Sequence, residues 1–336
     1  STFNFNNTST INFYGDGVAL FGNAGSTIND NGGIINTNGF NVERTRIANG
    51  TINITADTTI ADNNILGHVV NGEMNVFSGI TVAATGNKII GIYASGLKGA
   101  SSWLHTYEAN NFGILDFSNA ENSTALYLDN ARGENFGLTK VGSSSLGMYG
   151  VNNAELYNNS IIEAGNKAVG MYGKNSKIEN NNNISTLGDK AVGMYGVNSN
   201  LENKGNINLN NITTVGMYGD SSNVVNTNTL NVNGEKSVGI YGENFSNIQN
   251  NQNILLGSSS AIERANTGIY NNSSAVNNGN IIGGNYSIGI YNTGNFDNFG
   301  NIQLGTGAVG VYSDGGNSII HAGSTVSAGE AALLVK

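Results

Sequence analysis

The sequence predicts an all-β protein folded as a right-handed parallel β-helix, a solenoid with about 21–23 residues per coil. This prediction depends on a short phrase that recurs at a nearly fixed spacing, on three apolar-centred segments in each repeat, and on the complete absence of proline. Proline lacks the backbone N–H that an interior strand uses in pairing, so a proline-free chain of this length suits one made mostly of paired strands.

The recurring phrase consists of an apolar residue, glycine, a second apolar residue, tyrosine and glycine. Its clearest copies contain Tyr149, Tyr172, Tyr195, Tyr218 and Tyr241, and each of these tyrosines follows the previous one by 23 residues. Looser copies continue toward the end of the chain, so residues 146–334 are the most regular region. At this period, residues 1–336 are expected to form a single β-helix of roughly 15 coils.

The tyrosines of the phrase are expected to point outward and to stack as an exposed aromatic ladder. Side chains alternate between the two faces of a strand, so Val169 and Met171 are expected inside and Tyr172 outside. The small residues before the phrase, such as Ala168 and Ala191, are then expected on the outer face. Like residues stack in solenoids because this stabilises neighbouring coils, and the alternative is that the row binds sugar rings or a protein partner.

A second segment follows each phrase and has the pattern apolar residue, any residue, asparagine. The period of two places the apolar residue and the asparagine on the same inner face. The pattern therefore predicts a buried structural ladder in which each amide donates a hydrogen bond along the stack. Its expected members are Asn158, Asn180, Asn203, Asn226, Asn250, Asn278 and Asn298. A third segment begins with an aliphatic residue, such as Ile184 or Ile207, and completes the coil.

The longest irregular spacing separates Tyr93 from Tyr127, which are 34 residues apart. Residues 94–126 are therefore predicted to form a coil with a protruding loop. This loop carries the single tryptophan, and Trp103, His105 and Tyr107 are its candidate ligand-binding residues. The alternative is a loop or an extra strand whose tryptophan packs back on the solenoid.

Composition argues against several classes of function. The net charge of −9 and the 14 scattered lysines and arginines provide no basic groove for a nucleic acid. The chain has no cysteine, which excludes thiol catalysis, and His68, His105 and His321 are too widely spaced for a metal motif. We therefore expect no catalytic, cofactor-binding or metal site, and no enzyme activity. No apolar run is long enough for a membrane helix.

The phrase Val192-Gly193-Met194-Tyr195-Gly196, followed by the asparagine-rich segment 198–207, resembles the passengers of type V autotransporters. The resemblance is greatest to the large fusobacterial outer-membrane adhesins. It implies a monomeric rod on the bacterial cell surface, exported through a C-terminal β-barrel outside this sequence. It also implies binding to host or bacterial surface glycans or proteins. No signal sequence precedes the repeats, so the chain is expected to be an excised passenger segment.

These observations lead to three hypotheses of function. The first is a non-catalytic adhesin segment that mediates attachment to host cells or to other bacteria. The second is a purely structural stalk of such an adhesin, with the binding site elsewhere. The third is a β-helix polysaccharide lyase or hydrolase, which would require acidic and basic groups that converge across several coils. The charged residues here are spread thinly along the chain.

Overall fold

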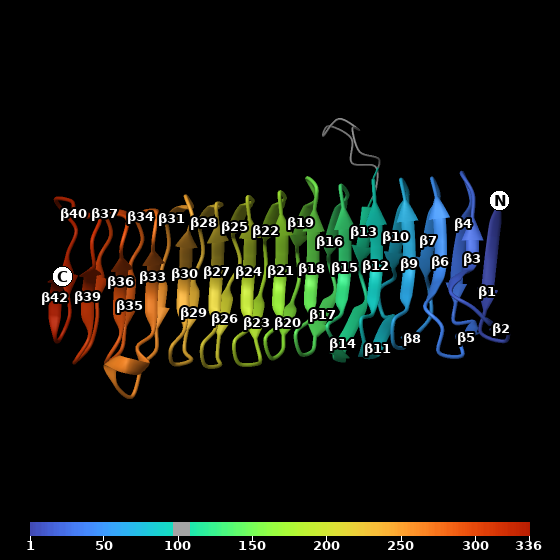
Figure 1. Cartoon of the computed structure of the whole chain (residues 1–336), viewed down its shortest axis with the longest axis horizontal. Coiled ribbons are helices and arrows are strands. Elements are labelled where there is room, and N and C mark those ends of the chain that lie inside the picture. Colours follow the sequence, from blue (N-terminus) through green and yellow to red (C-terminus); the bar gives the residue numbers. More distant parts are fainter. Residues whose placement is uncertain (97–107) are drawn as a thin grey trace. The chain divides into compact units, whose positions relative to one another are not determined.

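The chain folds into two compact units, Ser1–Ser176 and Lys177–Lys336, each a right-handed parallel β-solenoid. The computed structural model describes residues 1–96 and 108–336. In each unit the chain runs repeatedly through three parallel sheets, which confirms the predicted fold class (Figure 1). That residues 1–336 make one continuous domain stays a prediction.

We name the sheets by their residues: the tyrosine sheet carries the recurring phrase, the asparagine sheet follows it in each coil, and the third sheet completes the coil. In the first unit the tyrosine sheet contains β3 (Gly17–Gly22), β6 (Val42–Ala48), β9 (Ile65–Val70), β12 (Ile90–Ser95), β15 (Thr124–Asp129), β18 (Leu146–Val151) and β21 (Val169–Lys174). Its asparagine sheet contains β1 (Thr2–Asn6), β4 (Thr27–Asn31), β7 (Thr51–Ile54), β10 (Glu73–Val76), β13 (Glu108–Asn111), β16 (Arg132–Asn135) and β19 (Glu155–Asn158). Its third sheet contains β8 (Thr58–Ile60), β11 (Thr81–Asn87), β14 (Ile114–Glu121), β17 (Leu138–Val141) and β20 (Ile162–Ala164), while β2 (Thr10–Asn12) and β5 (Ile34–Asn36) form a separate pair.

The second unit repeats this arrangement with more uniform strands. Its tyrosine sheet contains β24 (Val192–Val197), β27 (Val215–Asp220), β30 (Val238–Glu243), β33 (Thr267–Asn271), β36 (Ile288–Asn292), β39 (Val309–Ser313) and β42 (Ala331–Val335). Its asparagine sheet contains β22 (Lys177–Asn180), β25 (Asn200–Asn203), β28 (Asn223–Asn226), β31 (Asn247–Asn250), β34 (Ser274–Asn277), β37 (Asn295–Asn298) and β40 (Asn317–Ile320). Its third sheet contains β23 (Ile184–Thr186), β26 (Ile207–Leu209), β29 (Leu230–Val232), β32 (Ile254–Leu256), β35 (Ile281–Gly283), β38 (Ile302–Gln303) and β41 (Val326–Ser327), and a short 3-10 helix, η1 (Ile262–Arg264), lies between β32 and β33.

Equivalent residues of successive coils lie directly over one another. Met148 pairs with Met171 and Tyr149 with Tyr172 in the first unit, and Tyr218 pairs with Tyr241 in the second. The asparagine sheets contribute seven strands to each unit, or 14 coils in total, close to the number expected from the period. Because side chains at equivalent positions are in register, each position of the repeat becomes a row along its unit.

The inner face of the tyrosine sheet differs from the prediction at the start of the phrase. Ala168 and Ala191 are fully buried, whereas Val169 is half-exposed. The expected alternation is wrong here because Gly170 and Met171 are both buried, so the pleat is interrupted at the glycine. A Cβ atom on the equivalent Gly147 would lie 2.4 Å from the carbonyl oxygen of Gly170 in the next coil. Glycine at this position accommodates the close approach without a clash, although Ala125 occupies the equivalent position in the preceding coil.

The turns on either side of the tyrosine strands use left-handed backbone conformations. Asn198 and Asn244 adopt φ angles of 48° and 49° after the strand, and Lys190 and Lys236 adopt 59° before it. Asparagine visits this region more readily than most residues, which explains part of its abundance at the corners.

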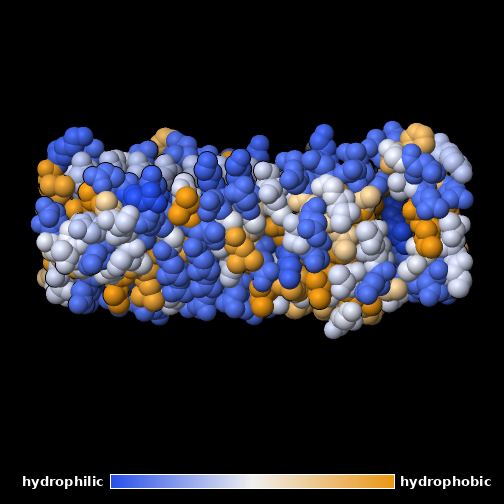
Figure 2. Space-filling view, turned by 90° about the horizontal axis from the view of Figure 1, so that it is seen from below, coloured by the Kyte–Doolittle hydropathy of each residue, from blue (hydrophilic) through white to orange (hydrophobic). Residues whose placement is uncertain are grey.

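The outer surface mixes polar and apolar side chains. On the face shown in Figure 2, hydrophobic side chains in orange are interspersed with hydrophilic side chains in blue. Among the described residues, none of the helices has the length and apolar character needed to cross a membrane.

Candidate binding face on the second unit

The outer face of the asparagine sheet in the second unit forms an open surface on which polar and apolar groups alternate. Strand residues alternate, so that Leu201 and Asn203 are buried while Asn200 is exposed and Glu202 is partly exposed. The same alternation in β28 exposes Asn223 and leaves Val225 half-exposed. Each strand therefore contributes two outward side chains, and the register aligns them from coil to coil.

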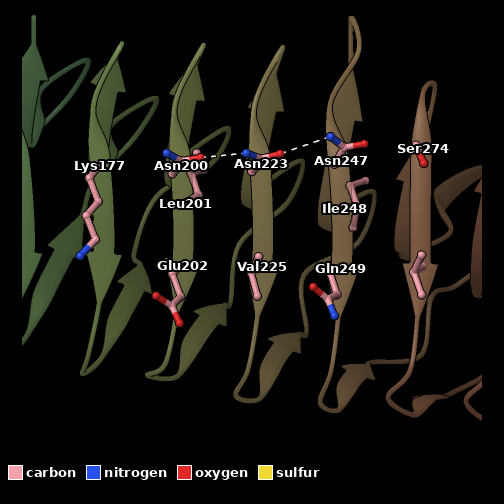
Figure 3. Close-up of a pocket in the computed structure, with 11 residues that line it drawn as sticks. Lys177, Asn200, Leu201, Glu202, Asn223, Val225, Asn247, Ile248, Gln249 and Ser274 are labelled. Atoms are coloured by element: carbon pink, nitrogen blue, oxygen red, sulfur yellow. Dashed lines mark hydrogen bonds between the residues drawn. The ribbon is translucent and has the colours of Figure 1, made fainter. Parts of the chain in front are cut away.

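A shallow depression of about 720 Å³ lies on this face and extends over β22, β25, β28, β31 and β34 (Figure 3). We refer to its lining residues as the candidate face. They are Lys177, Asn200, Leu201, Glu202, Asn223, Val225, Asn247, Ile248, Gln249, Ser274 and Val276. The depression is open to solvent, so a long ligand can lie across several coils without entering a closed cavity.

A ladder of amides crosses the middle of the candidate face. Asn223 Nδ2 donates to Asn200 Oδ1 at 2.9 Å, and Asn247 Nδ2 donates to Asn223 Oδ1 at 3.2 Å (Figure 3). A side-chain amide has two N–H donors and an oxygen with two lone pairs. The ladder therefore uses one donor and one lone pair of Asn223 and leaves one of each for a ligand.

Charged groups gather at one end of the candidate face and pair with one another. Lys204 Nζ lies 2.8 Å from Glu179 and 3.2 Å from Glu202, and Lys177 Nζ lies 3.1 Å from Glu179. Burial by itself raises the pKa of Glu179, but hydrogen bonds and ion pairs with Lys204 and Lys177 outweigh it and lower this pKa. The hydrogen bond to Glu179 in turn raises the pKa of Lys204. The rest of the candidate face is uncharged.

The buried asparagine ladder lies behind this face. In the second unit Asn180, Asn203, Asn226 and Asn250 are fully buried, and each Nδ2 donates to the Oδ1 of the next asparagine at 2.7–2.8 Å. Asn158 is buried in the first unit and accepts from Asn135 at 2.8 Å. The position of Asn158, Asn180, Asn203, Asn226, Asn250 and Asn298 on the inner face is as predicted.

The expected ladder residue Asn278 is wrong by one position. Asn277 is fully buried, accepts from Asn250 and donates to Asn298 at 2.8 Å. Asn278 is exposed and donates to Asn251. The small Ala275, rather than Val276, is the inward apolar residue of β34, so the alternation places Asn277 inside.

Two sets of buried asparagines were not predicted from the sequence. Asn111 and Asn135 extend the ladder in the first unit, where the less regular repeats concealed the pattern. In the second unit Asn271 donates to Asn292 at 2.7 Å. Asn271 lies at the repeat position that Gly242 occupies in the preceding coil. The signal for this pair is the replacement of the second glycine of the phrase by asparagine.

The outward tyrosines form a row on the tyrosine sheet of each unit. In the first unit His68, Tyr93, Tyr127, Tyr149 and Tyr172 follow one another at ring-centroid distances of 4.0–5.2 Å. In the second unit Tyr195, Tyr218, Tyr241, Tyr270, Tyr291 and Tyr312 follow at 4.6–4.9 Å. Most of these rings stack face to face, so their faces are covered by one another and mainly their edges reach solvent. Face-on stacking of a sugar ring would have to displace a neighbouring tyrosine.

The phenols of Tyr218 and Tyr241 hold their protons more firmly than free tyrosine because their pKa values are raised. Burial, and next the charge of Glu243, raises the pKa of Tyr241 to about 12. Burial together with a hydrogen bond to Glu243 raises the pKa of Tyr218 further. Both phenols are therefore uncharged at neutral pH.

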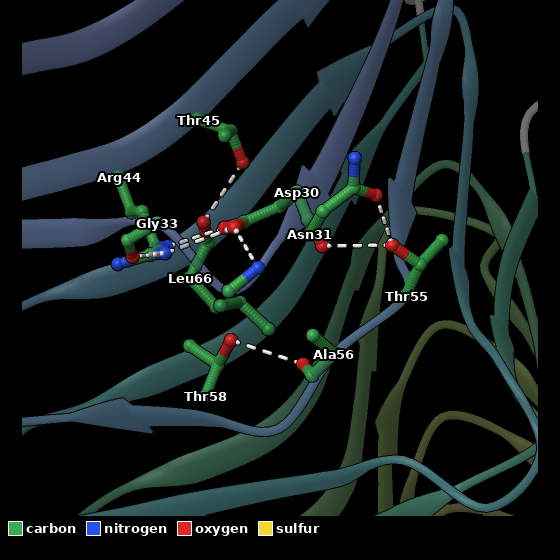
Figure 4. A network of polar contacts seen from close by, with 10 residues as sticks. Asp30, Asn31, Gly33, Arg44, Thr45, Thr55, Ala56, Thr58 and Leu66 are labelled. Atoms are coloured by element: carbon green, nitrogen blue, oxygen red, sulfur yellow. Dashed lines mark hydrogen bonds and ion pairs between the residues drawn. The ribbon is translucent and has the colours of Figure 1, made fainter. Parts of the chain in front are cut away.

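A buried ion pair, which the sequence did not reveal, lies in the first unit. Asp30 in β4 is fully buried, and Arg44 in β6 donates to its two carboxylate oxygens at 2.5 and 3.0 Å (Figure 4). Arg44 also donates to the carbonyl oxygen of Gly33, while Thr55 donates to that of Asp30. Asp30 takes the position that Asn111 and Asn135 take in later coils. Its carboxylate and its partner satisfy each other, so the pair is structural.

Trp103, His105 and Tyr107 lie in the segment 97–107, outside the described residues, and their binding role stays a prediction. His68 stacks on Tyr93 and His321 lies 2.7 Å from Asp297. Within residues 1–96 and 108–336, no three histidine, aspartate or glutamate side chains are grouped as a metal ion would require.

Comparisons with protein-family models, with curated proteins and with solved structures gave no match to this chain. The class that the fold itself defines is a parallel β-solenoid with asparagine and tyrosine ladders.

Proposed function

We propose that the chain is a non-catalytic segment of a bacterial cell-surface adhesin and that its candidate face contacts the ligand. The observation that carries this proposal is the open depression on the second unit, with unused amide donors and acceptors aligned over several coils. Binding commonly resides on surfaces that a rigid scaffold holds in place, and the solenoid supplies such a scaffold.

The chemistry of the candidate face suits hydroxyl-rich or amide-rich partners, namely surface glycans or proteins of a host or of another bacterium. The outward amides of Asn223 and Asn247 offer both donors and acceptors, while Val225 and Val276 offer apolar contacts. A site with these groups selects a ligand by paired hydrogen bonds rather than by charge. In this proposal the chain acts as a monomer anchored at the outer membrane.

The charged groups at one end of the candidate face favour binding over catalysis. A glycoside hydrolase needs two carboxyl groups that flank the scissile bond, and at least one of them must stay available for proton transfer. Here Glu179 and Glu202 both pair with Lys204, and the pKa of Glu179 is lowered rather than raised toward neutrality. This arrangement favours a structural role for the two carboxylates.

A stalk is the second candidate function. The buried ladder from Asn180 to Asn298 and the tyrosine row both continue through the second unit, and such continuity favours a spacer that keeps its form. A stalk with the binding site elsewhere would show no attachment of its own.

The first experiment measures binding of the purified chain to a glycan array, to bacteria and to host cells. A variant with Trp103→Ala and Tyr107→Ala is measured beside it. Attachment of both proteins supports the candidate face, whereas attachment lost in the variant assigns the site to the segment 97–107. Absence of attachment to every surface contradicts the adhesin proposal and favours the stalk.

A further inference from the structure

We propose that the tyrosine row of the second unit is a site of oxidative cross-linking, at which a haem peroxidase with hydrogen peroxide joins Tyr241 to Tyr218 or to Tyr270 as dityrosine. The proposal is independent of the ligand that the candidate face binds. It would covalently join neighbouring coils of the solenoid.

The geometry of the three rings favours coupling. The centroids of Tyr218 and Tyr241 are 4.7 Å apart with an interplanar angle of 11°, and those of Tyr241 and Tyr270 are 4.6 Å apart with an angle of 7°. Phenoxyl radicals couple through their ortho carbons, and parallel stacking at these distances brings the π systems of the two rings close together. Tyr195 and Tyr218 meet edge to face at 74°, which is less suitable for this overlap.

The formation of one dityrosine link consumes one molecule of hydrogen peroxide. Each of two phenols loses one electron and one proton to become a phenoxyl radical, and an ortho C–C bond forms between the two rings. Each ring then transfers its ortho hydrogen to the phenolic oxygen and becomes aromatic again. The peroxidase uses the two electrons and two protons to reduce hydrogen peroxide to two molecules of water.

A proton acceptor lies beside these rings. Tyr218 Oη donates to Glu243 Oε1, and Tyr241 Oη donates to Glu243 Oε2 at 3.4 Å. An oxidised phenol is strongly acidic and must release its proton together with the electron. The carboxylate of Glu243 lies where a general base is needed for either tyrosine.

The three tyrosines are exposed enough to be oxidised, and their stacking determines which residues become cross-linked. Tyr218, Tyr241 and Tyr270 are half-buried, so their exposed edges can transfer electrons to the peroxidase. A radical at Tyr241 has a tyrosine on each side within 5 Å, and coupling inside the chain therefore precedes encounters between chains. Tyr286 is also exposed, but it has no aromatic ring partner among the described residues.

The two links would join residues that are 23 and 29 positions apart in the sequence. Covalent links of this kind restrict the unfolded chain and stabilise the folded one. Cross-linked protein is therefore expected to unfold at a higher temperature than untreated protein.

The test treats the whole chain with peroxidase and hydrogen peroxide, followed by trypsin and mass spectrometry. Cleavage after Lys204, Lys236 and Arg264 places Tyr218, Tyr241 and Tyr270 in three separate peptides. The expected products join the peptide 237–264 to the peptide 205–236 or to the peptide beginning at residue 265, with the loss of two hydrogen atoms per link.

Two variants make the test specific. Tyr241→Phe keeps the stacked ring but cannot form the phenoxyl radical, so both products should disappear. Tyr286→Phe should leave them unchanged, and thermal unfolding verifies that both variants are folded. The proposal is overturned if dityrosine does not form, if it mainly joins separate chains, or if the two products persist in Tyr241→Phe.

Discussion

At the scale of single residues, the inner asparagines form buried hydrogen bonds that an apolar side chain could not form. Asn250, for example, donates once along the ladder to Asn277 and once to the carbonyl oxygen of Gln252 two residues later, at 2.8 Å in both cases. The ladder thus gives hydrogen-bond partners to buried polar groups at a corner of the coil. A buried polar group without a partner costs far more than the net gain of one hydrogen bond.

The neighbours Asn277 and Asn278 test this role. Asn277→Ala removes the acceptor of Asn250 and the donor to Asn298, so we expect unfolding free energy to fall by about 2–4 kcal/mol. Asn278→Ala removes only an exposed contact and should change it by less than about 0.5 kcal/mol. Denaturant unfolding of both variants measures the difference, and equal losses would contradict the assignment of Asn277 to the ladder.

At the scale of strands, the period could be predicted because identical residues stack in register. The tyrosine spacing identified the tyrosine sheet, and the asparagine pattern identified the inner row of the next sheet. The ambiguity at Val276-Asn277-Asn278 arose because either asparagine fits the pattern, and only the buried Ala275 decides between them. The reversed positions of Ala168 and Val169 could not be foreseen, since simple alternation assumes a regular pleat.

The candidate face was also beyond prediction from sequence. Its amide ladder includes Asn200, Asn223 and Asn247, but the equivalent positions in neighbouring coils are Lys177 and Ser274, so no continuous repeat is visible. The pair of Asp30 and Arg44 depends on two strands in different sheets, which a one-dimensional pattern does not bring together.

The first glycine of the phrase provides a test at the strand scale. In Gly147→Ala the added methyl group meets the carbonyl oxygen of Gly170 at 2.4 Å, so we expect a loss of stability of about 1–3 kcal/mol. In the same unit, Gly15→Ala adds a methyl group with no atom within 4 Å and should cost little. Similar unfolding midpoints for the two variants would show that the close approach of coils is not what requires glycine.

The tyrosine row predicts sensitivity to alkaline pH. The pKa of Tyr241 is raised to about 12 in the folded state, so the protonated phenol stabilises the fold. This contribution is complete below the ordinary pKa of about 10 and is lost as pH rises through about 12. Unfolding midpoints should fall over this range, and Tyr241→Phe should reduce the slope. An identical slope in the variant would contradict a role for this phenol.

At the scale of the whole molecule, stability and binding are separable. A solenoid is stabilised mainly by contacts between neighbouring coils, so changes of outward side chains should leave the fold intact. Asn223 is outward and exposed, and its substitution removes ligand contacts without opening the core. Asn231 offers a matched control, because it lies in an outward amide ladder of the third sheet with Asn208, at 2.7 Å.

The most direct measurement compares the affinity of the wild-type chain, Asn223→Leu and Asn231→Leu for the surface that the binding survey identifies. We predict that Asn223→Leu weakens binding by about tenfold or more, equivalent to about 1.4 kcal/mol, and that Asn231→Leu binds as the wild type does. Thermal unfolding verifies that both variants are folded. Unchanged affinity in folded Asn223→Leu would contradict the claim that the candidate face holds the ligand.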